Sequence, residues 1–288
     1  MAVRNAVPTS PGRADGASQS IKGGSEADAA ALAHYQNGAY YARRYRHLTA
    51  DRRFYVALCR QIGGPVLELG CGTGRISRAL AAAGLDVVGI DFATPMLVEA
   101  RSKQQAARLP GRLEYRQGDI RTLRLRRRFP TVIAPFNVFM HLETPDAMQA
   151  ALATVRAHLA HGGAFLFDVL MPPVAQLTFH SGKVLRGRAC LSPGGQMLAY
   201  EEAFSYDPLT QLQLIEARFV EPTSRLVRET LTLQHRIWFP QELAFHFAAA
   251  RFVTQGAFGA FDGAPLHAES SHQIYLLAPA RAAPGPPR

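Results

Sequence analysis

The chain has 288 residues, of which 48% are hydrophobic and 19% charged, enough apolar material for one large domain or two small ones. Its formal net charge of +10 comes mostly from arginine, and this bias beside abundant alanine indicates biased codon usage more than nucleic-acid binding. No apolar run approaches the roughly 20 residues of a membrane-spanning helix, and no secretory signal is visible, so we expect a cytoplasmic protein.

The two ends of the chain lack the periodic apolar residues of a folded domain. Residues 1–30 are rich in Ala, Gly, Ser and Pro and carry charges that cancel, which predicts a disordered leader. Residues 279–288 are expected to be a disordered tail. The three cysteines are far apart and form no CxxC pair, so we expect neither a disulfide framework nor a metal site.

Between these ends, the first half of the chain alternates strand and helix patterns. Short apolar runs predict strands at 64–70, 86–91, 112–120, 131–136 and 164–170. Apolar residues three and four apart predict helices at 75–84, 95–108 and 145–160, and the HGG at 161–163 should end the last of them. Apolar strands that alternate with helices form a parallel sheet covered on both faces, so we expect an α/β fold with a Rossmann-like doubly wound sheet.

The second half of the chain changes its period. Apolar and polar residues mostly alternate in three segments separated by turns, which predicts an inserted antiparallel sheet with strands at 197–207, 211–221 and 225–239. A helix at 240–250 and strands at 251–258 and 272–278 should complete a seven-stranded main sheet. The expected organisation is therefore a core at 31–180, an insert at 181–239 acting as a lid or dimer surface, and the rest of the core at 240–278.

A glycine motif, ELGCGTG at 68–74, joins the first strand to the first helix. Glycine allows the tight turn and close backbone approach, and free N–H groups at a helix start favour a polar or anionic ligand. The spacing is G-x-G-x-G, whereas dinucleotide-binding folds prefer G-x-G-x-x-G, so a dinucleotide oxidoreductase is disfavoured.

Two carboxylates end the next two strands. Asp91 can accept hydrogen bonds from ribose hydroxyls, and its alternative role is to cap the following helix. Asp119 can accept a hydrogen bond from an exocyclic amine, and its alternative role is to neutralise neighbouring arginines.

Five successive segments resemble the motifs of class I methyltransferases that use S-adenosylmethionine (SAM): VLELGCGTGRIS, VVGIDFATPMLVEAR, QGDI, TVIAPFNVFMHL and HGGAFLFDV. The resemblance covers roughly residues 35–170 and implies SAM as the cofactor. It implies that Glu68 orients the amino group of SAM, that Asp91 binds its ribose, that Asp119 takes the adenine amino group, and that three glycines wrap its methionine part: Gly70, Gly72 and Gly74. The remaining implied cofactor residues are Cys71, Phe92, Met96 (against the adenine), Ile120 and Pro135.

The candidate catalytic residues follow the fourth and fifth strands. A base is needed only when the methyl acceptor is a hydroxyl or a protonated amine, and His141 is the candidate, with a structural role as the alternative. Asp168 is the candidate to orient His141, and its alternative role is to satisfy a nearby loop. Candidate substrate residues are Tyr41, Asn137, His235 and Trp238, although core packing suits Trp238 as well.

These patterns together predict a SAM-dependent methyltransferase that acts on an oxygen or nitrogen of a small metabolite. The expected partner is a small-molecule substrate, with a homodimer possible and no membrane. Two alternatives stay open: a SAM-binding protein without activity, and an RNA methyltransferase, which the seven arginines in 112–128 suggest. No RNA-binding module or interleaving of aromatic and basic residues supports the latter.

Overall fold

The computed structural model describes residues 34–172, 177 and 184–280. The predicted leader at 1–30 lies outside the described residues, as does the predicted tail from 281 onward. Residue Pro279, which we assigned to the tail, is instead the last residue of a strand.

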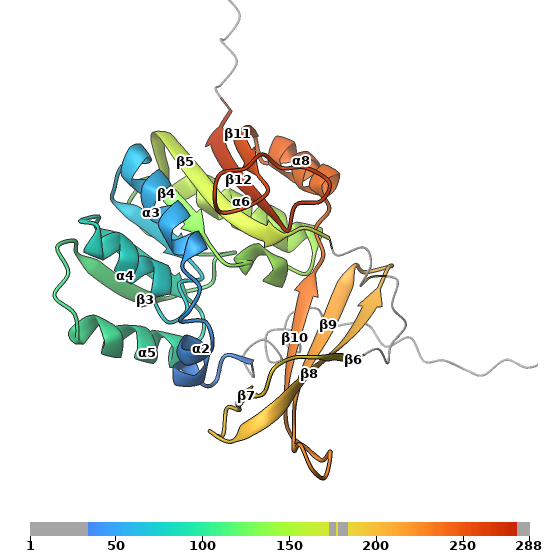
Figure 1. The fold of residues 1–288 in the computed structure, drawn as a ribbon. Coiled ribbons are helices and arrows are strands. Elements are labelled where there is room, and N and C mark those ends of the chain that lie inside the picture. The colour runs from blue at the N-terminus through green and yellow to red at the C-terminus, as the bar shows by residue number, and fades with distance from the viewer. Residues whose placement is uncertain (1–33, 173–176, 178–183, 281–288) are drawn as a thin grey trace, which may run out of the picture.

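The main sheet has seven strands in the order β11-β12-β5-β4-β1-β2-β3 (Figure 1). Strands β1 to β5 run parallel to one another, whereas β12 is antiparallel to both β5 and β11. The predicted seven-stranded doubly wound sheet is therefore confirmed. The strand bounds are Val66–Leu69 (β1), Val87–Asp91 (β2), Leu113–Gln117 (β3), Phe129–Ala134 (β4), Leu159–Leu170 (β5), Phe252–Phe258 (β11) and His272–Pro279 (β12).

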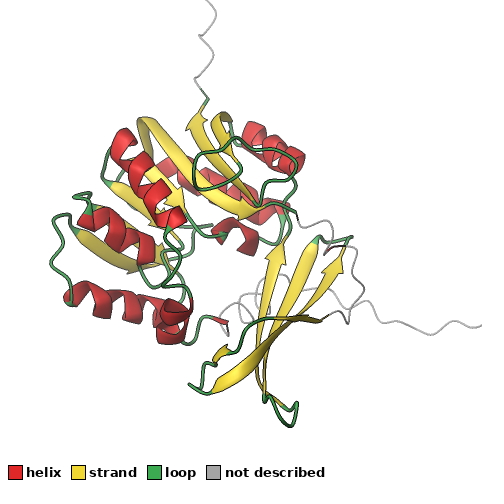
Figure 2. Cartoon of the chain, viewed as in Figure 1, coloured by secondary structure: helices red, strands yellow, loops and turns green. Residues whose placement is uncertain are grey.

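Helices cover both faces of this sheet, which is why its central strands are apolar on both sides (Figure 2). In β1, Val66 packs into one core cluster while Leu67 and Leu69 pack into the other. The helix bounds are Gly38–Arg44 (α2), Ala50–Ile62 (α3), Arg75–Ala82 (α4), Thr94–Gln105 (α5), Val138–His141 (η1, a 3-10 turn), Pro145–His158 (α6) and Pro240–Ala249 (α8). None of the helices in the described ranges combines the length and apolar character needed to cross a bilayer.

The HGG segment at 161–163 does not end helix α6, contrary to our expectation. The helix ends at His158, and the backbone is already extended at Leu159, where β5 begins. A Cβ on Gly163 would lie 2.7 Å from the carbonyl oxygen of Pro130, beside an irregularity in the pairing of β4 with β5. At least one of these glycines therefore allows β4 and β5 to approach closely. In sequence, such a glycine looks the same as one that ends a helix.

The insert is a separate antiparallel sheet in the order β10-β9-β8-β6, with β7 paired to β8. Its three long strands match the predicted ones, while β6 and β7 were missed because runs of three and two residues show no periodicity. The bounds are Val184–Arg186 (β6), Cys190–Leu191 (β7), Met197–Asp207 (β8), Leu212–Val220 (β9) and Val227–Arg236 (β10).

The inserted sheet is held against the core at two places. At one end, Tyr40 of α2 packs edge-on against Phe219, and the Arg44 guanidinium lies 4.2 Å from the centre of the Tyr200 ring. At the other end, Arg236 donates to the carbonyl oxygen of Glu143 at 3.1 Å and pairs with Glu242 of α8. The sheet therefore lies beside the segment that follows β4, where we expected substrate to bind (Figure 1).

Candidate functional site

The glycine motif forms the turn from β1 into α4 as predicted. Gly70, Gly72 and Gly74 all have positive φ angles, 67°, 52° and 72°. A Cβ on Gly70 would lie 2.4 Å from Val138, and one on Gly74 would lie 2.0 Å from the Tyr115 hydroxyl. At Gly72 nothing lies within 4 Å, so this glycine faces open space where a ligand can approach the backbone.

Asp91 connects the glycine turn to the start of α5. Its carboxylate accepts hydrogen bonds from the backbone N–H of Gly72 at 2.7 Å and of Ala93 at 2.9 Å. Burial raises the pKa of Asp91, and these backbone hydrogen bonds act in the opposite direction. The carboxylate thus holds the turn in shape, while its predicted contact with ribose stays a prediction.

Glu68 lies beneath the turn instead of beside it. The side chain is 1% exposed and accepts a hydrogen bond from the Ser77 hydroxyl, which ties β1 to α4. Burial raises the pKa of Glu68 to about 8. Its implied contact with the amino group of SAM is untested, and the structure gives it a supporting role for the turn.

Asp119 is bound by the arginine two residues later. The Arg121 guanidinium donates to both oxygens at 2.7 to 3.0 Å. Burial raises the pKa of Asp119, but the hydrogen bonds and charge of Arg121 outweigh it and the pKa is lowered. The structure therefore shows the neutralising role that we gave as the alternative, and binding of the adenine amino group would require Arg121 to share this carboxylate.

The other implied cofactor residues differ in their exposure. Met96 and Pro135 are buried, Ile120 is half-buried against the main core, and Phe92 is 37% exposed. Cys71 packs with residues of α5 and β3, and burial raises the pKa of its thiol well above the usual range, which fits packing and not nucleophilic chemistry.

Asp168 does not orient His141, so the catalytic pairing that we expected is wrong. Its carboxylate accepts hydrogen bonds from the Tyr55 hydroxyl at 2.6 Å and from the backbone N–H groups of Phe136 and Asn137 at 2.8 and 3.2 Å. Phe136 and Asn137 have φ angles of 67° and 63°, a strained conformation for residues other than glycine. Asp168 therefore stabilises the corner after β4, which is the loop-satisfying role.

His141 instead pairs with a tyrosine of the segment before α2. The Tyr35 hydroxyl lies 2.9 Å from Nε2 of His141, and the His235 ring of the inserted sheet packs edge-on against His141 with ring centres 4.8 Å apart. Burial lowers the pKa of His141 to about 4, and the neighbouring His34 adds to the effect. Both His141 and His235 are therefore neutral near pH 7.

An aromatic group continues from Tyr35 toward the glycine turn. Tyr41 lies 5.7 Å from Tyr35 and 4.7 Å from Tyr45, measured between ring centres, and Tyr45 contacts Phe136 at 5.1 Å. The Arg75 guanidinium, in the first residue of α4, lies 5.3 Å from the Phe136 ring. Tyr41, one of the candidate substrate residues, thus lies between the glycine turn and His141.

Four buried side-chain atoms around His141 and the adjoining inserted sheet have no hydrogen-bond partner in the described structure: His34 Nδ1, Asn137 Oδ1, Gln213 Nε2 and His235 Nδ1. Gln213 is directly opposite His235 in the pairing of β9 with β10. Unpaired buried polar groups cost about 1–3 kcal/mol each, so such a group is a sign of a missing ligand or water. Asn137 and His235 were predicted, whereas Gln213 gave no signal because strand pairing cannot be read from one sequence.

Trp238 is a core residue and does not line this site. It is 1% exposed, belongs to the main core cluster, and donates its indole N–H to the carbonyl oxygen of Phe139 at 3.0 Å. The substrate-binding assignment of Trp238 is therefore wrong, and the packing alternative holds.

The match to a family model described as a methyltransferase domain covers residues 66–163, from β1 into β5. This part of the chain is therefore similar in sequence to a methyltransferase domain. Solved methyltransferases share the fold over most of the chain. The CcbJ methyltransferase from Streptomyces caelestis aligns with a TM-score of 0.73, covering 86% of this chain and 98% of that one, at 23% sequence identity.

Curated relatives match the methyltransferase domain more closely but over shorter stretches. A cypemycin N-terminal methyltransferase from Streptomyces sp is 37% identical over 110 residues, which is 38% of this chain and 43% of that protein. A dTDP-3-amino-3,4,6-trideoxy-alpha-D-glucopyranose N,N-dimethyltransferase from Streptomyces venezuelae is 31% identical over 103 residues, 36% of this chain and 41% of that protein. The chain thus spans less than half the length of either relative.

Alanine substitutions at Gly72 and Gly74 separate two uses of glycine in the motif, access for a ligand and close packing. Gly74→Ala should lower the free energy of unfolding by about 3 kcal/mol, because strain at positive φ adds to the clash with Tyr115. Gly72→Ala has the same strain without a clash, so about 1 kcal/mol is expected. Urea denaturation measures both values. Equal losses in the two variants would contradict the packing role of Gly74.

The corner after β4 should depend on the carboxylate of Asp168. Asp168→Asn places an amide N–H₂ where an acceptor is needed, so we expect a loss of about 3 kcal/mol in the free energy of unfolding. The control is Tyr55→Phe, which removes one donor and leaves the carboxylate, with an expected loss of about 1 kcal/mol. Comparable small losses in both variants, measured by urea denaturation, would show that the corner is stable without Asp168.

Proposed function

We propose that this protein is a SAM-dependent methyltransferase that transfers a methyl group to a nitrogen or oxygen of a small metabolite. The observation that carries the proposal is the glycine turn, clamped by Asp91 at the adjoining ends of β1 and β2, within the matched methyltransferase domain. The names of the relatives include a cypemycin N-terminal methyltransferase and an N,N-dimethyltransferase for a dTDP-linked 3-amino sugar, which favours nitrogen as the acceptor.

The residues around the turn fit the cofactor that the family uses. Gly72 faces open space, so the backbone of the turn is accessible to the methionine part of SAM. We infer that the Asp91 carboxylate, one residue before the exposed Phe92, meets the ribose and that Met96 meets the adenine; Met96 is 1% exposed, so this contact requires the ligand to displace a covering side chain. When bound, SAM supplies an activated methyl group on a sulfonium, and the protein supplies alignment.

A proton leaves the acceptor during methylation, and Tyr35 with His141 can take it. Burial raises the pKa of Tyr35 far above the usual range, so its hydroxyl stays protonated and donates to Nε2 of the neutral His141. In this proposal the acceptor passes its proton to the Tyr35 oxygen while the Tyr35 proton moves to His141, which holds it only transiently because burial disfavours the charged imidazolium. The edge contact with His235 then keeps the His141 ring in place.

The inner face of the inserted sheet is the proposed substrate wall. The strand pairing places Gln213, His235 and Tyr206 side by side at the end near His141. The same face continues with apolar side chains that are half-buried: Phe204, Ile215, Leu231 and Leu233. We infer an acceptor with a polar end that satisfies Gln213 and His235 and an apolar body that lies along the sheet, so that the insert acts as a lid.

The opposite side of the inserted sheet offers a surface for a second copy of the chain. Met197 and Val227 are 62% and 45% exposed, and their register places both on the face away from Gln213. We infer a homodimer through this face, which leaves the inner face free for substrate.

Cofactor binding is tested first, by calorimetric titration with S-adenosylhomocysteine. We expect saturable micromolar binding that Asp91→Ala loses, because the variant removes both the shape of the turn and the ribose acceptor. Asp86→Ala is the matched control, since Asp86 lies just before the same strand and bonds the backbone of Arg112. Absence of binding in the wild type, or equal binding in all three proteins, would overturn the proposed function.

The proton path is tested with Tyr35→Phe and His141→Ala on an acceptor found by screening for SAM consumption. Both should lower kcat by about 10²-fold with little change in KM, because a positioned proton acceptor contributes on that order. Tyr40→Phe on the same segment packs against Phe219 and should retain full activity. Turnover that is unchanged in both site variants would refute the path.

The pH dependence has a defined sign. The pKa of His141 is about 4 in the folded protein, so the ring is already neutral and able to accept a proton from pH 6 to 8. His141 should therefore produce no acid limb in kcat in that range, and a limb would appear only as the pH approaches 4. A wild-type limb near pH 6.5 that His141→Ala removes would contradict the buried neutral state.

A further inference from the structure

The connection between β3 and β4 contains no helix, unlike the connections before β2, β3 and β5, which contain α4, α5 and α6. Residues 118–128 cross the sheet as an irregular segment in which Ile120, Leu123 and Leu125 pack against the main core. The arginines between and after them are mostly exposed. A helix would normally cover this part of the sheet. Here the irregular segment and arginine side chains cover it instead, and Val88 of β2 is 5% exposed.

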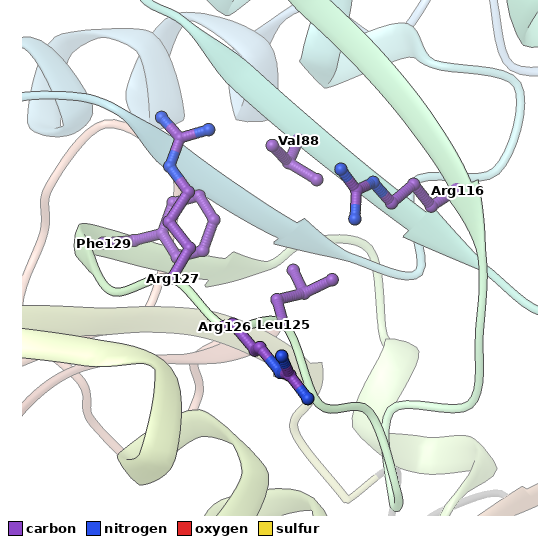
Figure 3. A pocket seen from close by; sticks show the side chains of 6 residues that line it. All are labelled: Val88, Arg116, Leu125, Arg126, Arg127 and Phe129. Atoms are coloured by element: carbon purple, nitrogen blue, oxygen red, sulfur yellow. The ribbon is translucent and has the colours of Figure 1, made fainter.

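A hollow lies on this side of the sheet, between the arginine-rich segment and the first half of β2 (Figure 3). Its floor is formed by Val88, Leu125 and Phe129, and its polar lining is three arginines: Arg116, Arg126 and Arg127. The guanidinium groups of Arg116 and Arg127 lie on either side of Val88, whereas Arg126 extends away beyond Leu125 (Figure 3). An adjoining hollow shares Val88 and Arg127 and adds Arg112, Asp86 and Glu114.

The charges around the two hollows are not balanced by the protein. Arg126 and Arg127 form no ion pair among the described residues. The Arg127 guanidinium lies 5.1 Å from the centre of the Phe129 ring, a cation–π contact. Arg116 bonds Glu114 at 2.5 Å, and these two residues are adjacent to Ile90 and Val88 in the pairing of β2 with β3. Four arginines thus surround two carboxylates, and an anion there would relieve repulsion among the cations.

We propose that this hollow binds a phosphate ester, with the phosphate between Arg116 and Arg127 and its organic part on the floor of Val88 and Leu125. Guanidinium groups bind phosphate oxygens through paired N–H donors, and the apolar floor favours a ligand that is not a bare ion. The site is separate from the proposed cofactor site, because Val88 and Asp91 are three residues apart along β2, which is about 10 Å of strand.

The experiment uses phenyl phosphate, inorganic phosphate and phenol as probes, in the presence of saturating S-adenosylhomocysteine so that the glycine turn is occupied. Phenyl phosphate should bind saturably and about tenfold more tightly than inorganic phosphate, because only the ester covers the floor. Phenol should show no binding. Calorimetry gives each affinity, and the change of affinity with salt concentration gives the number of charges involved.

Three variants identify the site. Arg127→Gln should weaken phenyl phosphate binding about tenfold, whereas Glu114→Gln should strengthen it several-fold, since a competing negative charge is removed. Arg53→Gln, at an exposed position of α3, is the charge-matched control and should leave binding unchanged. Equal effects of Arg127→Gln and Arg53→Gln would show binding to net charge alone and would overturn the proposal.

Two further outcomes also decide against it. Binding of phenyl phosphate no tighter than inorganic phosphate would show that the apolar floor takes no part. Binding of a single-stranded RNA oligonucleotide that Arg127→Gln weakens, together with no binding of phenyl phosphate, would assign the surface to nucleic acid instead. The thermal unfolding midpoint of each variant checks that its fold is intact.

Discussion

The buried carboxylate of Asp168 is the contact on which the site depends. It lies in β5, receives the Tyr55 hydroxyl from α3, and receives two backbone N–H groups from the corner after β4. That corner has two consecutive residues at positive φ, which is a strained conformation. The Asp168 carboxylate is the acceptor for the N–H groups of both residues. Because η1 follows directly, the same carboxylate determines where His141 lies.

A second constraint is that the polar groups of the site are buried without becoming charged. His34, His141 and His235 come from three distant parts of the sequence, and burial lowers the pKa of each. Neutral imidazoles can be packed together, whereas imidazolium ions would repel one another and lose their hydration. The inserted sheet contributes His235 to this group, so its position and the protonation state of the site are linked.

Features that depend on local sequence were predictable, whereas features that depend on packing between distant residues were not. The central strands and the glycine turn were predictable because an apolar run and a G-x-G-x-G spacing depend only on local sequence. Asp168 was assigned the wrong partner because a carboxylate at a strand end does not reveal which backbone groups lack an acceptor. Trp238 was ambiguous for a related reason: an aromatic side chain after a strand is apolar in both a pocket and a core, and only packing decides.

The sequence by itself determined the doubly wound core, the antiparallel insert, and the turn that the matched methyltransferase domain contains, since these follow from local periodicity and backbone freedom. The tertiary structure alone decided which side chains meet: Tyr35 with His141, Gln213 with His235, and Asp168 with the corner at 136–137. These pairs are between 22 and 106 residues apart, and strand order, register and the packing of the segment before α2 bring them together. A single sequence contains no record of those distances, because many different partners would satisfy the same local pattern.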